Sequence, residues 1–179
     1  MSERSERLEF LFSIHPNAKK RGGRIPDRKH SADSGYDVYP VDLSDLSDKY
    51  PNFPYTLKPG EVIRIPTGLT FQAPVGWSPD VVAKTSRAWE GIEPAAIVYD
   101  WGYRPNPNDP AGSVFSVRNV SNVPVVIDGK KSFVQLILRP VCPADVVVVN
   151  HGTIEAGTER GQKRYGAADN DNDNKDLIA

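Results

Sequence analysis

Proline and glycine interrupt this chain so often that they restrict its fold more than any other feature. Fourteen glycines and sixteen prolines are spread over 179 residues, which exceeds average usage and excludes long uninterrupted helices. The apolar runs between them are short and rich in valine, isoleucine, phenylalanine and tyrosine. Short β-prone runs at close intervals are typical of a sandwich or barrel. The sequence therefore predicts a single all-β domain.

The expected elements follow these runs along the chain. Strands are expected at residues 8–14, 36–43, two within 55–74, one ending at 84, then 97–103, 113–120, two within 124–141, and 145–150. One short helix is expected at residues 86–92. The basic segment 17–30 is expected to be a loop, and three prolines exclude regular structure from residues 104–112.

Charge and cysteine content exclude several classes of function. A protein that binds nucleic acid or a membrane is expected to carry an excess of basic residues, and the net charge of this chain is only -1. The single cysteine, Cys142, excludes an internal disulfide and a thiolate metal cluster, and the three scattered histidines argue against a histidine-ligated metal. No signal sequence follows the polar start, so we expect a cytoplasmic location.

Two places could carry chemistry on composition alone. Asp100 ends an apolar run just before the proline-rich loop, where a partly desolvated carboxylate could act as a base toward water, and Tyr103 lies beside it. The alternative is an aspartate that caps a local turn. Arg160 and Tyr165 could clamp a phosphate and stack on a base, or they could belong to a solvated tail.

Five polar segments carry a more specific pattern. They are DSGYDV (33–38), KTSRAWEGI (84–92), AIVYDWGYR (96–104), DGKKSFVQLIL (128–138) and RGQKRYG (160–166). In this order they resemble the five motifs of the trimeric dUTPase family: AGYDL, a motif that begins Arg-Ser-Gly, GVIDxxYRG, GdRIAQLil and RGxxGFGSTG. The segments FSIHPNAKK and TLKPGEVIRIPTGL also resemble that family. Five motifs in one order carry far more weight than any one of them.

The resemblance implies a fold, an assembly and a reaction. The fold would be an all-β, dUTPase-like jelly-roll or β-barrel (β-clip) with one short helix. Residues 1–159 would form the β domain, with 1–7 mobile, and residues 160–179 a flexible arm that carries the fifth motif. In that family the site is shared among three chains, so three copies would assemble as a homotrimer. The reaction would be the Mg2+-dependent attack of water at the α-phosphate of dUTP, giving dUMP and pyrophosphate.

The resemblance also implies a role for each matched residue. Asp100 would orient and deprotonate the water, and Asp37 would contact the hydration shell of Mg2+. Substrate binding would fall to Lys84, Thr85, Ser86, Tyr103, Gln135, Arg160 and Tyr165. Among these, Tyr103 would lie under the deoxyribose, Arg160 would close over the γ-phosphate, and Tyr165 would stack on the base.

Several departures from the family pattern keep alternatives open. Lys84 replaces the arginine of the second motif, and Thr85-Ser86-Arg87 replaces Ser-Gly-Leu, which puts a cation beside the phosphates or turns it outward. Pro105 replaces a glycine after the third motif, and the fifth motif ends in GAAD instead of hydroxyl residues. These changes are compatible with a modified deoxyuridine nucleotide as substrate, or with weaker activity.

Two other functions share the same fold. The second motif matches dCTP deaminase in length, but Ser116 occupies the approximate place of the glutamate that deamination requires, and residues 112–119 contain no carboxylate. The other alternative is a catalytically silent trimer that binds nucleotide or a partner protein. Retention of Asp100, Tyr103, Gln135 and Arg160 together favours the enzyme.

Overall fold

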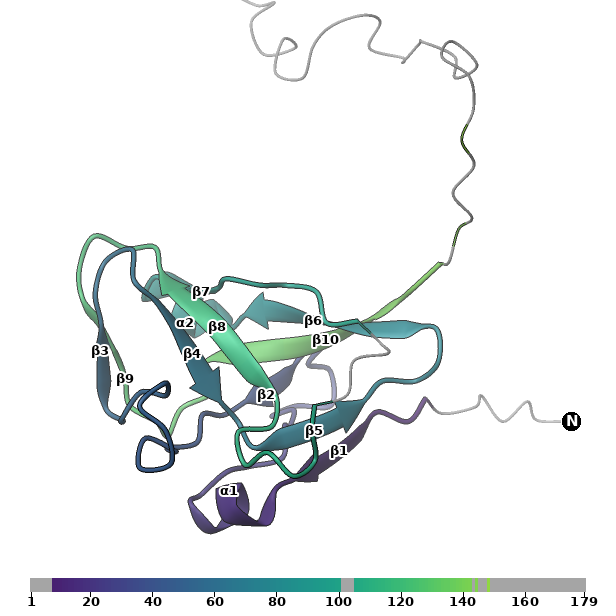
Figure 1. The fold of residues 1–179 in the computed structure, drawn as a ribbon. Helices are drawn as coiled ribbons and strands as arrows, with labels where there is room; N and C mark the ends of the chain where they lie inside the picture. The colour runs from purple at the N-terminus through teal and green to yellow at the C-terminus, as the bar shows by residue number, and fades with distance from the viewer. Residues whose placement is uncertain (1–7, 101–104, 143, 145–147, 149–179) are drawn as a thin grey trace, which may run out of the picture. The chain divides into compact units, whose positions relative to one another are not determined.

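The computed structural model describes residues 8–100, 105–142, 144 and 148 (Figure 1). Residues Met1–Cys142 belong to one compact unit, and a second unit begins at Pro143. The predicted boundary between the β domain and the arm, at residues 159 and 160, lies outside the described residues. So does almost all of the strand predicted at residues 145–150.

Strands dominate the described part of the chain. In chain order the elements are β1 (Leu11–Ile14), α1 (Pro16–Lys20), β2 (Tyr36–Val38), β3 (Tyr55–Leu57), β4 (Val62–Pro66), β5 (Leu69–Gln72), β6 (Trp77–Ala83), α2 (Thr85–Trp89), β7 (Ile92–Pro94), β8 (Val114–Asn119), β9 (Val125–Ile127) and β10 (Val134–Pro140). The prediction of an all-β chain is confirmed. The segment 55–74, expected to hold two strands, holds three.

The helices differ slightly from the prediction. α2 lies near the expected place but ends at Trp89, because Gly91 takes a positive φ of 88° and β7 follows at once. α1 lies in the segment expected to be a basic loop. It begins at Pro16, whose fixed φ suits a first helical turn, and His15 Nδ1 accepts a hydrogen bond from Asn17 N at 3.2 Å.

The strands pair antiparallel in four small sheets within the described residues. β1 pairs with β5, β3 pairs with β9, β10 lies between β2 and β6, and β8 lies between β4 and β7 (Figure 1). These sheets do not close into one barrel. The described part of the strand expected at residues 97–103 is not a strand, because only Val98 makes an isolated bridge, with Asp80.

Alternation of buried and partly buried side chains along β10 places Gln135 on the opposite face from the core. Phe133, Val134 and Leu136 are almost fully buried in the main apolar cluster. Because successive side chains of a strand point to opposite faces, Gln135 faces away from Val134 and Leu136. The burial of its neighbours therefore fixes where Gln135 points.

Candidate functional site

The sheet β2–β10–β6 brings three of the five predicted motifs together. In the strand register Asp37 lies opposite Gln135, and Gln135 lies opposite Val82 on the other side. Lys84 directly follows β6 and begins the turn into α2. A pocket of about 480 Å³ opens beside these strands and is lined by Asp37, Lys84, Thr85, Ser86 and Gln135.

Asp37 is the centre of the hydrogen-bond network in this pocket. Gln135 Nε2 donates to Asp37 Oδ1 at 2.9 Å, and Lys84 Nζ donates to Asp37 Oδ2. Lys84 Nζ also donates to Ser132 Oγ at 2.8 Å. Because Asp37 is largely buried, with 8% of the residue exposed, the Lys84 ammonium supplies the counter-charge that a buried carboxylate needs.

Gly35 allows the first and fourth motifs to approach each other. A Cβ atom at residue 35 would lie 2.9 Å from Gln135 Oε1 and 3.0 Å from Gln135 Cβ. Such distances are shorter than normal carbon contacts, so a larger residue would push the Gln135 side chain out of place. The glycine of the first motif is thus required by close packing against Gln135.

Two lining residues of the pocket were missed by the sequence reasoning. Lys29 and His30 line it from the segment before β2, together with Asp33. This segment is held locally, because His30 N donates to Asp33 Oδ2 at 2.8 Å and Arg28 Nη1 donates to Asp33 O at 3.3 Å. The signal was available, since basic residues stand immediately before the first motif, but the segment was interpreted only as a loop.

Arg87 is not turned outward, which was one of the two positions expected from the sequence. It is buried, with 5% of the residue exposed, and lines a neighbouring pocket together with Lys84 and Ser86. Its Nε donates to Ser132 O at 3.3 Å, and its Nη1 pairs with Glu90. Arg87 therefore links α2 to the segment that precedes β10.

The third motif lies elsewhere in the same chain. Ser78 Oγ donates to Tyr99 O at 2.5 Å, and Tyr99 N donates to Pro79 O at 3.2 Å. The Tyr99 ring packs on Phe71 and Phe115, with centroids 5.3 and 5.2 Å apart. Asp100 follows this fixed residue and is exposed.

Asp100 and Lys84 are far apart along β6. The Tyr99 carbonyl contacts Ser78, near the beginning of β6, whereas Lys84 follows its end. Six residues of extended strand span about 20 Å. A single chain therefore does not bring Asp100 to Lys84. The predicted residues Tyr103, Arg160 and Tyr165 lie outside the described part of the chain.

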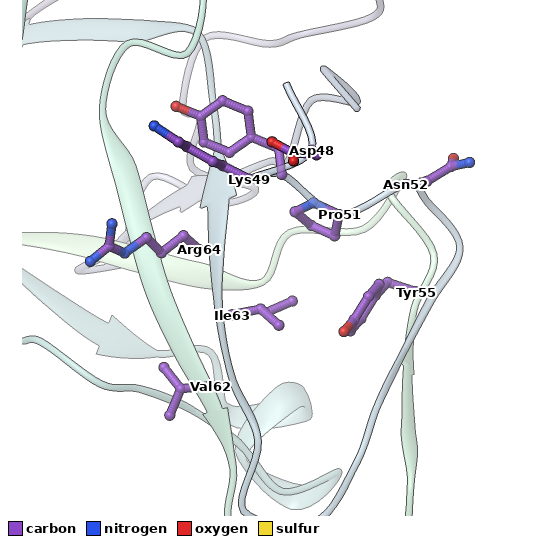
Figure 2. Close-up of a pocket in the computed structure, with 9 residues that line it drawn as sticks. Asp48, Lys49, Pro51, Asn52, Tyr55, Val62, Ile63 and Arg64 are labelled. Carbon is purple, nitrogen blue, oxygen red and sulfur yellow. The ribbon is translucent and has the colours of Figure 1, made fainter. Parts of the chain in front are cut away.

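A second pocket contains none of the predicted site residues. It has a volume of about 460 Å³ and lies between residues 48–55 and β4. Figure 2 shows Tyr55, Ile63 and Arg64 among its lining side chains. The first, second and fourth motifs therefore meet at the pocket around Asp37 and not at this one.

The comparison with known sequences identifies the family. No family model matches the chain. The deoxyuridine 5'-triphosphate nucleotidohydrolase of Bdellovibrio bacteriovorus is 30% identical over 151 residues, which cover 81% of this chain and 87% of that protein. The chain belongs to the dUTPase family. The resemblance seen in the five motifs is thereby confirmed.

Solved dUTPase structures share the fold. A dUTPase of Staphylococcus bacteriophage 80alpha superposes with a TM-score of 0.66 at 16% identity, over 89% of this chain and 98% of that one. A dUTPase of EIAV superposes with a TM-score of 0.58 at 17% identity, over 82% and 100%. The predicted dUTPase-like jelly-roll fold is confirmed. No helix in the described residues has the length and apolar character needed to cross a bilayer.

Proposed function

We propose that this dUTPase-family chain hydrolyses dUTP to dUMP and pyrophosphate. The observation that carries the proposal is the pocket in which the first, second and fourth motifs meet, in a chain 30% identical to a deoxyuridine triphosphate nucleotidohydrolase. A phage 80alpha dUTPase of the same fold was solved with the analogue dUpNHpp. We also propose a cytoplasmic location, where deoxynucleoside triphosphates are made and used.

The pocket residues suit the binding of a triphosphate. Lys84 offers a cation, Thr85 and Ser86 offer hydroxyl donors, and the Gln135 amide contributes a further polar group. We assign these four side chains to the phosphates. Tyr103 is assigned to the deoxyribose, Arg160 to the γ-phosphate and Tyr165 to the base, as the sequence predicts.

Asp100 is assigned the role of the base that activates the attacking water. The carboxylate would take a proton from a water molecule as the water oxygen bonds to the α-phosphorus and the bond from that phosphorus to the pyrophosphate oxygen breaks. The Asp100 carboxylate is exposed and follows Tyr99, which is packed in place, so it could contact a neighbouring copy of the chain. This position fits a base that acts on substrate bound in the pocket of that neighbouring copy.

The site fits Mg2+ held through water better than a protein-built metal cage. The described residues contain no cluster of three or more His, Cys, Asp or Glu side chains. Both oxygens of Asp37 already accept hydrogen bonds, so its role would be to orient metal-bound water. When bound, Mg2+ would neutralise charge on the substrate phosphates, which are its main ligands. A structural Mg(II) ion is described in a phage phi11 dUTPase of this fold.

The separation of about 20 Å along β6 supports a homotrimer with shared sites. Because Asp100 lies far from Lys84 in its own chain, we propose that a neighbouring copy supplies the base to each pocket. A closed ring of three copies would give each pocket one Asp100. The proposal thus assigns Asp100 to one copy, and Asp37, Lys84 and Gln135 to the next.

Pyrophosphate release from a panel of deoxynucleoside triphosphates tests the proposed activity. The panel includes dUTP, 5-modified dUTP analogues and dCTP, each with Mg2+. We expect release from dUTP, and Asp100→Asn should lower kcat about a thousandfold while binding of dUpNHpp is retained. Asp48→Asn, at an aspartate in the second pocket, is the matched control and should keep full activity.

Other results would change the assignment. No pyrophosphate from any of these nucleotides would contradict the hydrolase and favour the silent trimer. Ammonia released from dCTP would indicate a deaminase. Preference for a 5-modified analogue over dUTP would keep the reaction but change the substrate.

A further inference from the structure

Three departures from the family pattern meet in one contact. Lys84 stands where the second motif has arginine, and Arg87 stands where it has leucine. In the fourth motif, GdRIAQLil, arginine precedes glutamine by three residues, and here that place is Ser132. Lys84 Nζ donates to Ser132 Oγ at 2.8 Å, and Arg87 Nε donates to Ser132 O at 3.3 Å. The three changed residues therefore form one connected unit.

A lysine in this place needs a partner that an arginine would not need. A guanidinium presents its donors in a rigid planar fork, whereas an ammonium is a point charge at the end of a flexible four-carbon side chain. Lys84 Nζ carries three donor hydrogens, and Asp37 and Ser132 accept two of them. One donor remains for the pocket, which Lys84 lines together with Thr85 and Ser86.

Ser132 is the partner of Lys84 that has no other assigned role. On the proposed function, Asp37 would also orient metal-bound water, so its carboxylate would be shared between that water, Gln135 and Lys84. Ser132 has no such second task, and it is buried, with 5% of the residue exposed. Its hydroxyl can therefore hold the ammonium in place throughout the binding of substrate.

Arg87 fixes the main chain at Ser132. Its guanidinium is buried and reaches from α2 to the Ser132 carbonyl at one end and to the Glu90 carboxylate at the other. The turn before Ser132 is held separately, because Asp128 Oδ1 accepts from Lys130 N at 2.8 Å and from Lys131 N at 2.9 Å. Ser132 is thus held from both sides.

We propose that Ser132 positions the Lys84 ammonium for the substrate phosphates, and that Arg87 acts with Ser132 by fixing its main chain. The family motif has an arginine where this chain has Ser132. Here an arginine of α2, Arg87, contacts the same segment. Ser132 and Arg87 are positioning residues, since neither is assigned a contact with substrate. This inference rests on the proposed function, because it assigns Lys84 to phosphate.

The decisive variant is Ser132→Ala, compared with Ser132→Thr and with Ser113→Ala. Ser113 is the control because it is also a buried serine, on the segment that leads into β8, and its Oγ has no hydrogen-bond partner among the described residues. We expect Ser132→Ala to raise the Kd for dUpNHpp and the KM for dUTP about tenfold, with kcat within about twofold. Ser132→Thr should restore most of the affinity, and Ser113→Ala should leave it unchanged.

A double-mutant cycle separates positioning from a general structural effect. Lys84→Arg supplies a guanidinium that holds its own geometry, so adding Ser132→Ala to Lys84→Arg should change the Kd less than about twofold. Arg87→Met should weaken binding in the wild-type background in the same direction as Ser132→Ala. Equal losses from Ser132→Ala in the wild-type and Lys84→Arg backgrounds, or a loss below about threefold in the wild-type background, would overturn the proposal.

A measurement without substrate keeps this inference distinct from the proposed activity. The Lys84 ammonium should give an observable ¹⁵N-NMR signal in the intact protein, because its hydrogens are held, and Ser132→Ala should broaden it. Inorganic pyrophosphate should sharpen the signal further. If dUTP is not hydrolysed but these NMR responses occur, the proposed function fails while the positioning role stands. An unchanged signal in Ser132→Ala overturns the positioning role whatever the activity.

Discussion

Mixing two inactive variants tests whether each site is built from two copies. Asp100→Asn removes the proposed base, and Lys84→Met removes a cation of the pocket. Asp100 follows Tyr99, whose carbonyl contacts Ser78, and Lys84 lies six residues farther along β6, about 20 Å away. In the proposed trimer, Asp100 and Lys84 of one chain therefore belong to different sites. Neither variant alone would retain a complete site.

The expected recovery of activity in the mixture follows from the fraction of sites that are intact. In trimers assembled at random from equal amounts of both variants, a site is intact when its pocket comes from an Asp100→Asn chain and its base from a Lys84→Met chain. Each condition holds in about half of the cases, so about one quarter of the sites should work. The mixture should then release pyrophosphate from dUTP at about one quarter of the wild-type rate per chain.

A second mixture provides the matched control. Lys84→Met and Asp37→Asn affect the same pocket, because Lys84 Nζ donates to Asp37 Oδ2 within one chain. Every site built from these two variants carries one defect, and no recovery is expected. The variants are refolded together, and native mass spectrometry confirms the mixed trimers. A mixture of Asp100→Asn and Lys84→Met that forms mixed trimers but stays inactive would refute the shared site.

Three further changes test individual features of the chain. Gly35→Ala places a Cβ atom 2.9 Å from Gln135 Oε1, so it should raise the KM for dUTP at least severalfold, and unchanged steady-state kinetics would contradict the packing argument. Leu136→Ala should lower the free energy of unfolding by about 2–5 kcal/mol in urea titrations, because Leu136 is fully buried, and a loss below about 1 kcal/mol would show that the core collapses around the gap. Burial opposes ionisation of Asp42, but hydrogen bonds from two main-chain amides and a serine hydroxyl outweigh it and hold the pKa below its usual value. The stability that Asp42 contributes is therefore present above about pH 4 and lost as the pH falls through the lower pKa of the folded state. Asp42→Asn should flatten the acid side of the plot of unfolding free energy, measured in urea, against pH. Parallel plots for the wild type and the variant would contradict this.

Most of the described strands were predictable because their signal is local. Proline and glycine mark where each run ends, and alternation along residues such as Val134 and Leu136 marks the buried face. α1 was not predicted, because its start depends on one hydrogen bond from Asn17 to His15 within a segment that reads as basic and polar. The end of α2 was missed for a similar reason, since it depends on the positive φ of Gly91.

The site was predictable only where a motif names the residue. The motifs indicated Asp37, Lys84 and Gln135, and the register of β2, β10 and β6 brings them together. Arg87 could not be placed from the sequence, because its partner Ser132 is 45 residues away and meets it only in the folded chain. The resemblance already implied a site shared among chains, but the position of Asp100 relative to Lys84 within one chain follows from the direction of β6.

If each site is shared between copies as proposed, the anchoring of Tyr99 against Ser78 makes catalysis depend on the protein concentration. A chain on its own would then hold the proposed base, Asp100, far from Lys84. Dilution below the dissociation constant of the assembly would therefore silence turnover while each chain keeps its fold. Synthesis of the protein would then raise activity more steeply than in proportion to its amount, until the pool of free chains is small.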